Sequence, residues 1–101
     1  MSYEIYHFAW RGIEIEARYN PNHWGEIAHL EIQSLAPKNE PLPITGTGYR
    51  SHFHPRAQIE LNEPEHRGDA LIQHVIDWLD AEAAKPQWIK FVQGRQQLEL
   101  F

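Results

Sequence analysis

A strict two-residue alternation of apolar and polar side chains restricts the fold of this chain more than any other feature. Over residues 13–19 every odd position is apolar and every even position is charged. Over residues 28–33 the pattern returns, with the apolar residues now at the even positions. Because successive side chains of a β-strand point to opposite faces, each segment predicts a strand with one buried and one solvated face.

The segment before this alternation is apolar on both of its faces. Residues 3–10 are rich in aromatic side chains, which favour strands, and Arg11-Gly12 supplies a turn into the next strand. We therefore expect a first strand that is central in the sheet or covered on both sides. The turn-rich residues 20–25 are expected to form a loop, and residues 26–35 a third strand. The three strands together predict an antiparallel meander.

The centre of the chain has the composition of an ordered connector. Three prolines and two glycines fall within residues 36–48. Proline cannot donate to a strand ladder or continue a helix, so we expect a loop here. Residues 49–53 are then expected to form a short edge strand that Pro55 ends, and residues 58–61 a further short extended segment.

A helical pattern dominates the last third of the chain. Apolar residues recur there at the helical spacing of three and four, at Leu71, Val75, Trp78 and Leu79. Asp69 suits the N-cap of this helix, and Pro86 stops it near Lys85. Residues 87–92 are expected to form a second short helix capped by Gly94, or a strand. The fold class that follows is α+β, an antiparallel sheet of three or more strands with one main helix packed on a face.

Composition excludes several classes of protein. The chain has 101 residues, of which 42% are hydrophobic, so it suits one small domain and is too apolar for a disordered chain. Nine Lys and Arg against 14 Asp and Glu give a net charge of −5, which argues against direct nucleic-acid binding through phosphates. Cysteine is absent, which excludes disulfides and Cys-based zinc sites. No apolar run approaches the roughly 20 residues of a membrane span and no leader opens the chain, so we expect a cytoplasmic protein.

The last residues differ in character from the rest. We expect a single α+β domain over residues 1–93 and a tail over residues 94–101 that carries a linear motif. The chain ends Gln-Leu-Glu-Leu-Phe. This pentapeptide resembles the motif with which bacterial DNA polymerases and repair proteins bind the sliding clamp: Gln-Leu, a variable position that is often Ser or Asp, then Leu-Phe. The resemblance implies that the partner is the bacterial sliding clamp.

By the same resemblance, each motif residue has a role. Gln97 hydrogen-bonds in a small polar subsite of the clamp, Leu98 bridges toward an apolar pocket, and Leu100 with Phe101 fills that pocket. Glu99 departs from the usual Ser or Asp, which bears on affinity. Burying three apolar side chains at about 1.5–3 kcal/mol each, less the cost of ordering a tail, predicts binding of about micromolar strength. The alternative is a structural strand, in which Leu98 and Leu100 alternate and Phe101 joins the core.

Histidines provide a second group of candidates, because the chain has seven of them. His52 and His54 fall on one side of the expected strand, a spacing that can bind a metal, with His66 or His74 as a third ligand. No acidic residue stands at a diagnostic spacing, so we expect locally hydrogen-bonded histidines, no metal and no other cofactor. Ser51 precedes His52, but neighbouring strand residues point to opposite faces, and the two are not a catalytic pair.

The glycine-rich loop before this strand is a candidate anion site. It combines hydroxyls, glycines and an arginine, and Gly46, Gly48, Tyr49 and Arg50 could cradle an anion through backbone N–H groups and the guanidinium. The loop lacks the Lys-Ser/Thr ending of a phosphate-binding P-loop. A tight structural turn, with Arg50 paired to a neighbouring carboxylate, is the favoured interpretation.

The body of the chain carries its own resemblance. Residues 41–54, Pro-Leu-Pro-Ile-Thr-Gly-Thr-Gly-Tyr-Arg-Ser-His-Phe-His, are similar to a segment of small proteins of bacterial plasmids and integrative elements, and the similarity includes residues 13–19. We therefore expect a mobile-element accessory protein, not an enzyme, that binds the sliding clamp. The alternatives are a small metal- or anion-binding protein or enzyme centred on residues 49–54, and an inhibitory protein–protein interaction module. The sequence does not decide the oligomeric state.

Overall fold

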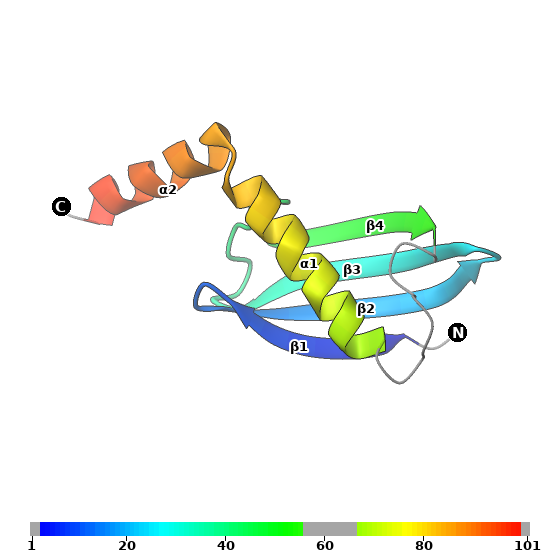
Figure 1. Cartoon of the computed structure of the whole chain (residues 1–101). Coiled ribbons are helices and arrows are strands. Elements are labelled where there is room, and N and C mark those ends of the chain that lie inside the picture. The colour runs from blue at the N-terminus through cyan, green and yellow to red at the C-terminus, as the bar shows by residue number, and fades with distance from the viewer. Residues whose placement is uncertain (1–2, 56–66, 100–101) are drawn as a thin grey trace.

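The computed structural model describes residues 3–55 and 67–99 (Figure 1). Four strands come first and two helices follow: β1 (Glu4–Trp10), β2 (Ile13–Trp24), β3 (Ile27–Ala36), β4 (Tyr49–Pro55), α1 (Arg67–Ala83) and α2 (Pro86–Glu99). The strands pair antiparallel in the order β1-β2-β3-β4. The predicted α+β fold and the antiparallel meander are confirmed, and β4 is the expected edge strand ending at Pro55.

Strand β1 lies at the other edge of the sheet, so the expectation that it is central is wrong. One of its faces packs on the core through Tyr6, Phe8 and Trp10, whereas Ile5 on the opposite face is exposed. The turn into β2 uses Arg11 and Gly12, both with positive φ. Strand β1 is therefore apolar on both faces because one face is buried and the other exposes apolar side chains to solvent.

Strand β2 is longer than expected, because residues 20–24 continue it where a loop was predicted. Its pairing with β3 shifts between Asn20 and Trp24, so that residues 21–23 lie opposite Ala28 alone. A bulge of this kind leaves backbone groups outside the regular ladder and therefore accommodates a proline within a strand. The β2–β3 turn is confined to Gly25, whose φ is +55°, and Glu26.

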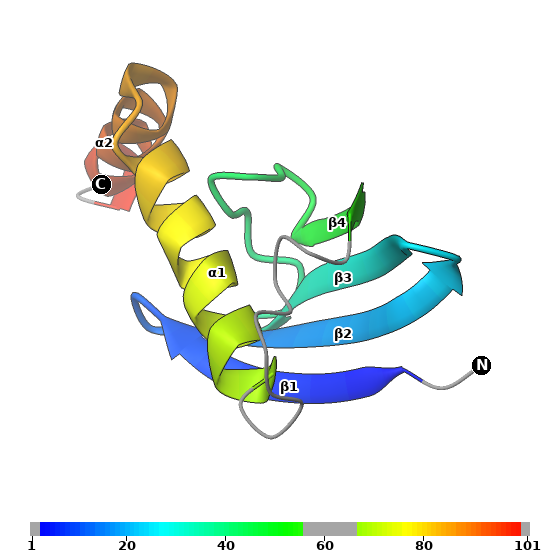
Figure 2. The ribbon, with the colours of Figure 1, turned by 45° about the vertical axis from the view of Figure 1, so that its right-hand side comes forward.

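Helix α1 lies across one face of the sheet, and the core fills the space between them (Figures 1 and 2). Leu71, Val75 and Leu79 are fully buried, as the helical spacing predicts. They meet the apolar face of β2 and β3, formed by Ile15, Ala17, Tyr19, Ala28, Leu30 and Ile32. Trp10 Nε1 also donates a hydrogen bond to Asp80 Oδ1 at 2.9 Å, which ties α1 to β1. The structure is therefore a two-layer arrangement with one covered and one open sheet face.

The loop between β3 and β4 is ordered by its own contacts. Leu42 and Ile44 are buried in the core, and a bridge joins Leu42 to Thr45. The backbone N–H of Ser34 donates to the carbonyl oxygen of Gly48 at 2.9 Å. This is the connector that the prolines predict.

Helix α2 extends away from the sheet (Figure 1). It continues past Gly94 to Glu99, so the expected cap at Gly94 is wrong, and residues 94–99 are helical in place of the alternative strand.

The short extended segment expected at residues 58–61 lies outside the described residues. Neither of the two helices in the described part is long and apolar enough to cross a membrane.

Candidate functional site

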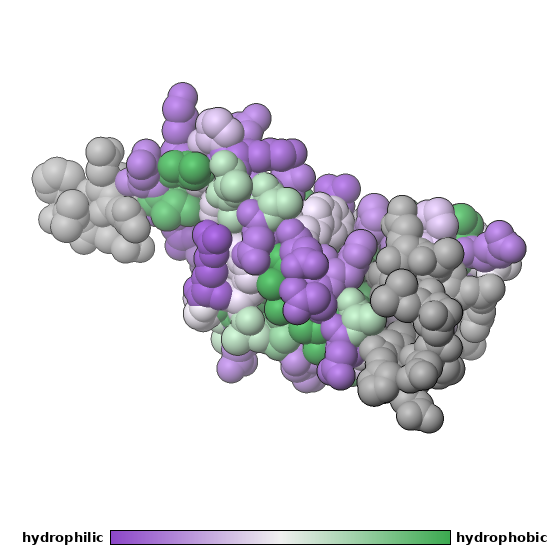
Figure 3. Space-filling view, viewed as in Figure 1, coloured by the Kyte–Doolittle hydropathy of each residue, from purple (hydrophilic) through white to green (hydrophobic). Residues whose placement is uncertain are grey.

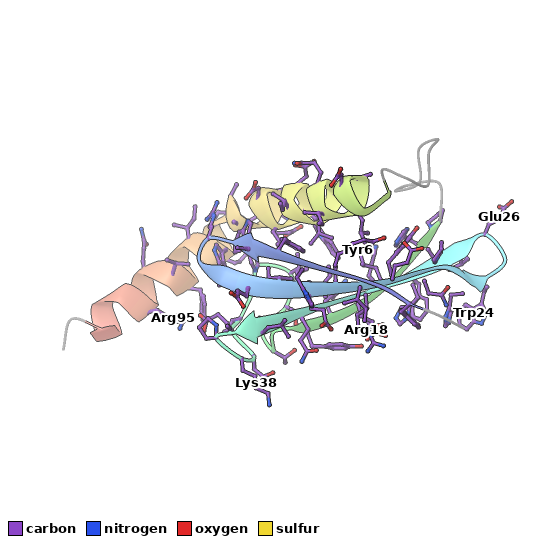
Figure 4. The ribbon with its side chains drawn as sticks, turned by 90° about the horizontal axis from the view of Figure 1, so that it is seen from below. Tyr6, Arg18, Trp24, Glu26, Lys38 and Arg95 are labelled. Atoms are coloured by element: carbon purple, nitrogen blue, oxygen red, sulfur yellow. The ribbon has the colours of Figure 1, made fainter. Side chains whose placement is uncertain are left out.

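The face of the sheet opposite α1 is open and carries large apolar side chains. Figure 4 shows Tyr6 on the side of α1 and Arg18 on the other side. The strand alternation and the ring contacts place four exposed apolar residues on this open face: Ile5, Trp24, Tyr49 and Phe53. Exposed apolar side chains that gather on one face indicate an interaction surface.

A hydrogen-bonded network centred on His29 of β3 lies at one corner of this face. His29 Nε2 is 2.6 Å from Ser51 Oγ, and its Nδ1 is 2.7 Å from the hydroxyl of Tyr3. Glu31 Oε1 lies 3.7 Å from the same Nδ1. Burial lowers the pKa of His29 from its ordinary value, Glu31 opposes this shift, and the nearby His23 adds to it. Both ring nitrogens are engaged, so the network holds the imidazole in one orientation.

Sequence reasoning missed this network. It correctly separated Ser51 from His52, but the imidazole that meets Ser51 comes from the neighbouring strand. In the β3–β4 register Glu31 pairs with Ser51 and His29 with Phe53, so His29 and Ser51 are diagonal neighbours on one face. Only this register could have identified the pair. It could not be predicted from the sequence, because the Pro- and Gly-rich loop between the two strands is too irregular to fix how they align.

His29 also belongs to a group of four adjoining rings that we call the aromatic corner, comprising His23, Trp24, His29 and Phe53. Phe53 stacks on His29 with centroids 4.3 Å apart, and Trp24 stacks on Phe53 at 5.4 Å with an interplanar angle of 8°. His23 lies 4.6 Å from Trp24 and 5.3 Å from Phe53. Trp24 is 66% exposed and Phe53 is 47% exposed. The corner thus presents two substantially exposed aromatic side chains to solvent.

The predicted histidine pair lies on the covered face, next to α1. The rings of His52 and His54 are 5.4 Å apart, and His74 of α1 is 6.4 Å from His54. Burial lowers the pKa of His52 and of His74, and the proximity of His54 adds to both shifts. The structure therefore brings His74 of α1 together with His52 and His54 of β4 in one cluster. No group of His, Asp or Glu among the described residues has the arrangement of a metal site, and His66 lies outside them.

The glycine-rich loop residues are divided between the two faces. Thr45 Oγ1 donates to the carbonyl oxygen of Tyr49 at 2.8 Å, and Tyr49 itself faces the open side. Arg50 points to the α1 side, where it donates to the carbonyl oxygen of Ile44 at 3.4 Å and lies over Trp78. Within the described residues these are its partners, in place of the expected carboxylate. Gly46 is exposed and Gly48 is buried under the loop.

Helix α2 is joined to the body near its start and again at Arg95. Trp88 packs against the core, and Arg95 forms an ion pair with Glu40. A cavity of about 390 Å³ lies between α2, the β1–β2 turn and the proline-rich loop. Figure 3 shows hydrophobic side chains gathered on α2, where Ile89 and Phe91 are exposed.

The predicted clamp motif lies at and beyond the end of α2. Its backbone is helical as far as Glu99. The side chains of Gln97 and Leu98, and the whole of Leu100 and Phe101, lie outside the described residues. The predicted roles of these four residues therefore stay predictions.

Comparison with known protein families gives a match that covers most of the chain. Residues 3–88 match the family described as KlcB third domain. No curated protein and no solved structure matches the chain. The matched region covers the sheet, α1 and the first residues of α2, and it stops before the predicted clamp motif. The family is plasmid-associated, which confirms the plasmid setting that residues 41–54 predict. The chain belongs to the KlcB third-domain family.

Proposed function

We propose that this protein is a plasmid-associated accessory protein that binds the bacterial sliding clamp through residues 97–101. The observation that carries the proposal is the position of this motif at the end of an arm, α2, that extends from the domain (Figure 1). The family match stops at residue 88. A motif placed in this way is able to dock on a partner while the sheet and α1 keep their packing.

The body holds α2 up to a residue just before the motif. Trp88 packs on the core, and Arg95 pairs with Glu40, two residues before Gln97. Insertion of the motif into a groove in an extended form requires only the last turn of α2 to unwind. Helix ends fray readily, and Gly94 weakens this part of the helix by about 0.5–1 kcal/mol relative to alanine. The unwinding is therefore a small cost against the burial of three apolar side chains.

The acidic charge of the chain is consistent with this role. A net charge of −5 disfavours gripping DNA phosphates directly. A protein that docks on the clamp reaches replicating DNA without contacting it. Binding to the clamp would then bring the domain to DNA on which a clamp is present.

Point variants of the intact chain test the proposal against purified sliding clamp. We expect binding of about micromolar strength, and a loss of about tenfold or more for Gln97→Ala and for Phe101→Ala. Gln96→Ala is the matched control, because it removes the same side chain one position outside the motif and should leave affinity unchanged within about twofold. Circular dichroism confirms that each variant is folded. Equal affinity for all variants, or no binding of the unmodified chain, contradicts the proposal.

A further inference from the structure

We propose that the aromatic corner is a docking site for a partner protein that places an arginine or lysine side chain on the exposed Trp24–Phe53 stack. This site lies on the open sheet face and is independent of the clamp motif. Trp24 and Phe53 lie nearly parallel with centroids 5.4 Å apart, and both are substantially exposed. Exposed tryptophan is characteristic of the few residues that carry most of the binding energy in an interface.

Hydrogen bonds and ring contacts within the chain position the side chains of the corner. His29 is held by the Tyr3 hydroxyl and Ser51, and Phe53 stacks flat on its ring at 4.3 Å. Trp24 in turn lies on Phe53, near the end of the β2–β3 hairpin (Figure 4). A surface that is already ordered loses little conformational entropy on binding. The arrangement therefore suits a recognition site better than a set of mobile apolar side chains would.

The chain's own packing indicates what kind of group this surface accepts. Four arginines lie over aromatic rings of the same chain, in the pairs Arg11–Trp10, Arg18–Tyr3, Arg50–Trp78 and Arg95–Phe91. Within the described residues, no cation lies over Trp24 or Phe53. The negative face of an indole or phenyl ring attracts a cation, and a guanidinium also stacks on it.

Charge complementarity supports the same occupant. The chain carries a net charge of −5. On the open face, Glu31 lies 3.7 Å from His29 of the aromatic corner, and Glu16 lies further along β2. These carboxylates attract a basic protein surface and repel phosphate groups. An exposed aromatic stack by itself could bind either a protein side chain or a nucleic-acid base. The negative charge therefore favours a protein partner over a single-stranded nucleic acid.

The test uses the intact chain labelled with ¹⁵N and a capped pentapeptide, Gly-Arg-Gly-Arg-Gly, as the probe. The chain has four tryptophans, so four indole N–H signals report on four places at once, and Trp24→Phe assigns the one of interest. We expect the peptide to move the Trp24 signal selectively and the signals of Trp10, Trp78 and Trp88 little. Binding should weaken by about fivefold or more in Trp24→Ala and in Phe53→Ala.

Two controls make the result specific to the corner. Leu35→Ala removes another exposed apolar side chain, eight residues along β3 from Ile27, which pairs with Trp24, and should leave the titration unchanged. The pentapeptide Gly-Glu-Gly-Glu-Gly should move no indole signal. The proposal is overturned if the glutamate peptide acts equally, if Leu35→Ala has the effect of Trp24→Ala, or if octathymidine moves the Trp24 signal while the arginine peptide does not.

Discussion

Arg95 in α2 forms an ion pair with Glu40 in the β3–β4 loop, across 55 residues of chain. The Glu40 side chain is only 17% exposed and that of Arg95 is 42% exposed, so the pair is partly shielded from solvent. The contact lies between the anchored start of α2 and the predicted clamp motif. It therefore sets the point at which the arm leaves the body.

Removing this contact should loosen the arm and leave the domain intact. We expect Glu40→Gln to lower the free energy of unfolding by about 1 kcal/mol or less, because a partly exposed ion pair contributes little. Backbone amides in α2 should exchange with deuterium faster, while those of β2 and β3 should not change. Glu82→Gln is the control, since it breaks the surface pair with Lys85, 2.9 Å away, at the end of α1. Unchanged exchange in α2 would show that the ion pair does not hold the arm.

Stabilising the helix ahead of the motif should weaken clamp binding. A Cβ atom added at Gly94 meets nothing within 4 Å, so Gly94→Ala raises helix stability by about 1 kcal/mol without a clash. If the last turn must unwind to bind, affinity should fall by up to about fivefold. Titration calorimetry against the clamp measures this, with Gln93→Ala, at an exposed neighbour, as the control. Tighter binding by Gly94→Ala would mean that the helical form is the one that binds.

Gly48 is required by its conformation and by its surroundings. Its φ is +77°, and an added Cβ would lie 2.5 Å from Ser34 Oγ and 2.7 Å from the carbonyl carbon of Asn39. Gly48→Ala should therefore lower the free energy of unfolding by roughly 1–3 kcal/mol from backbone strain, with the overlap adding to this. At Gly46 nothing lies within 4 Å, so Gly46→Ala should change it by less than about 0.5 kcal/mol. Urea denaturation compares the two, and equal effects would contradict this account of the loop.

The histidine cluster makes stability depend on pH. The pKa of His52 and of His74 is lowered from the ordinary 6.5, chiefly by burial and then by neighbouring positive charge on His54, with Arg50 adding to it at His52 and Asp77 opposing it at His74. Well above pH 6.5 these groups are neutral in both states, and stability is at its full value. As the pH falls below 6.5, the unfolded chain binds protons first, so the free energy of unfolding decreases.

Urea denaturation at pH 7.5 and pH 5.5 measures this dependence. We expect lower stability at pH 5.5, and a smaller difference between the two pH values in His74→Gln, which removes one of the buried groups. His7→Gln is the matched control, because His7 is exposed on the opposite face, 3.0 Å from Glu16. The account fails if stability is unchanged or higher at pH 5.5.

The sequence predicts the interior of this protein better than its edges. The alternation in β2 and β3 and the helical spacing of Leu71, Val75 and Leu79 all identify core residues, since burial imposes these periodicities. The position of β1 at an edge of the sheet was not predictable. An apolar residue such as Ile5 can be buried in a central strand or exposed on an edge strand, and the sequence does not distinguish the two cases. Likewise, the bulge that lets β2 continue past Asn20 depends on its pairing with β3.

The candidate sites likewise include contacts that the local sequence predicts and contacts that only the fold creates. The pairing of His52 with His54 follows from strand geometry, but the addition of His74 required the packing of α1 on the sheet. The His29–Ser51 contact and the Trp24–Phe53 stack arise from residues that are more than 20 positions apart in the chain and become neighbours through strand register. Local pattern contains no information about such contacts. The clamp motif is the converse case, a short segment whose prediction rests on its letters alone.

The most direct test of the central claim is the affinity of purified bacterial sliding clamp for the intact chain and for the chain lacking residues 97–101. Isothermal titration calorimetry gives both values under one condition. The account predicts a Kd of about micromolar magnitude for the intact chain and no measurable heat for the shortened one, with identical circular dichroism spectra in the strand region. Equal affinity of the two chains, or no binding by either, would contradict it.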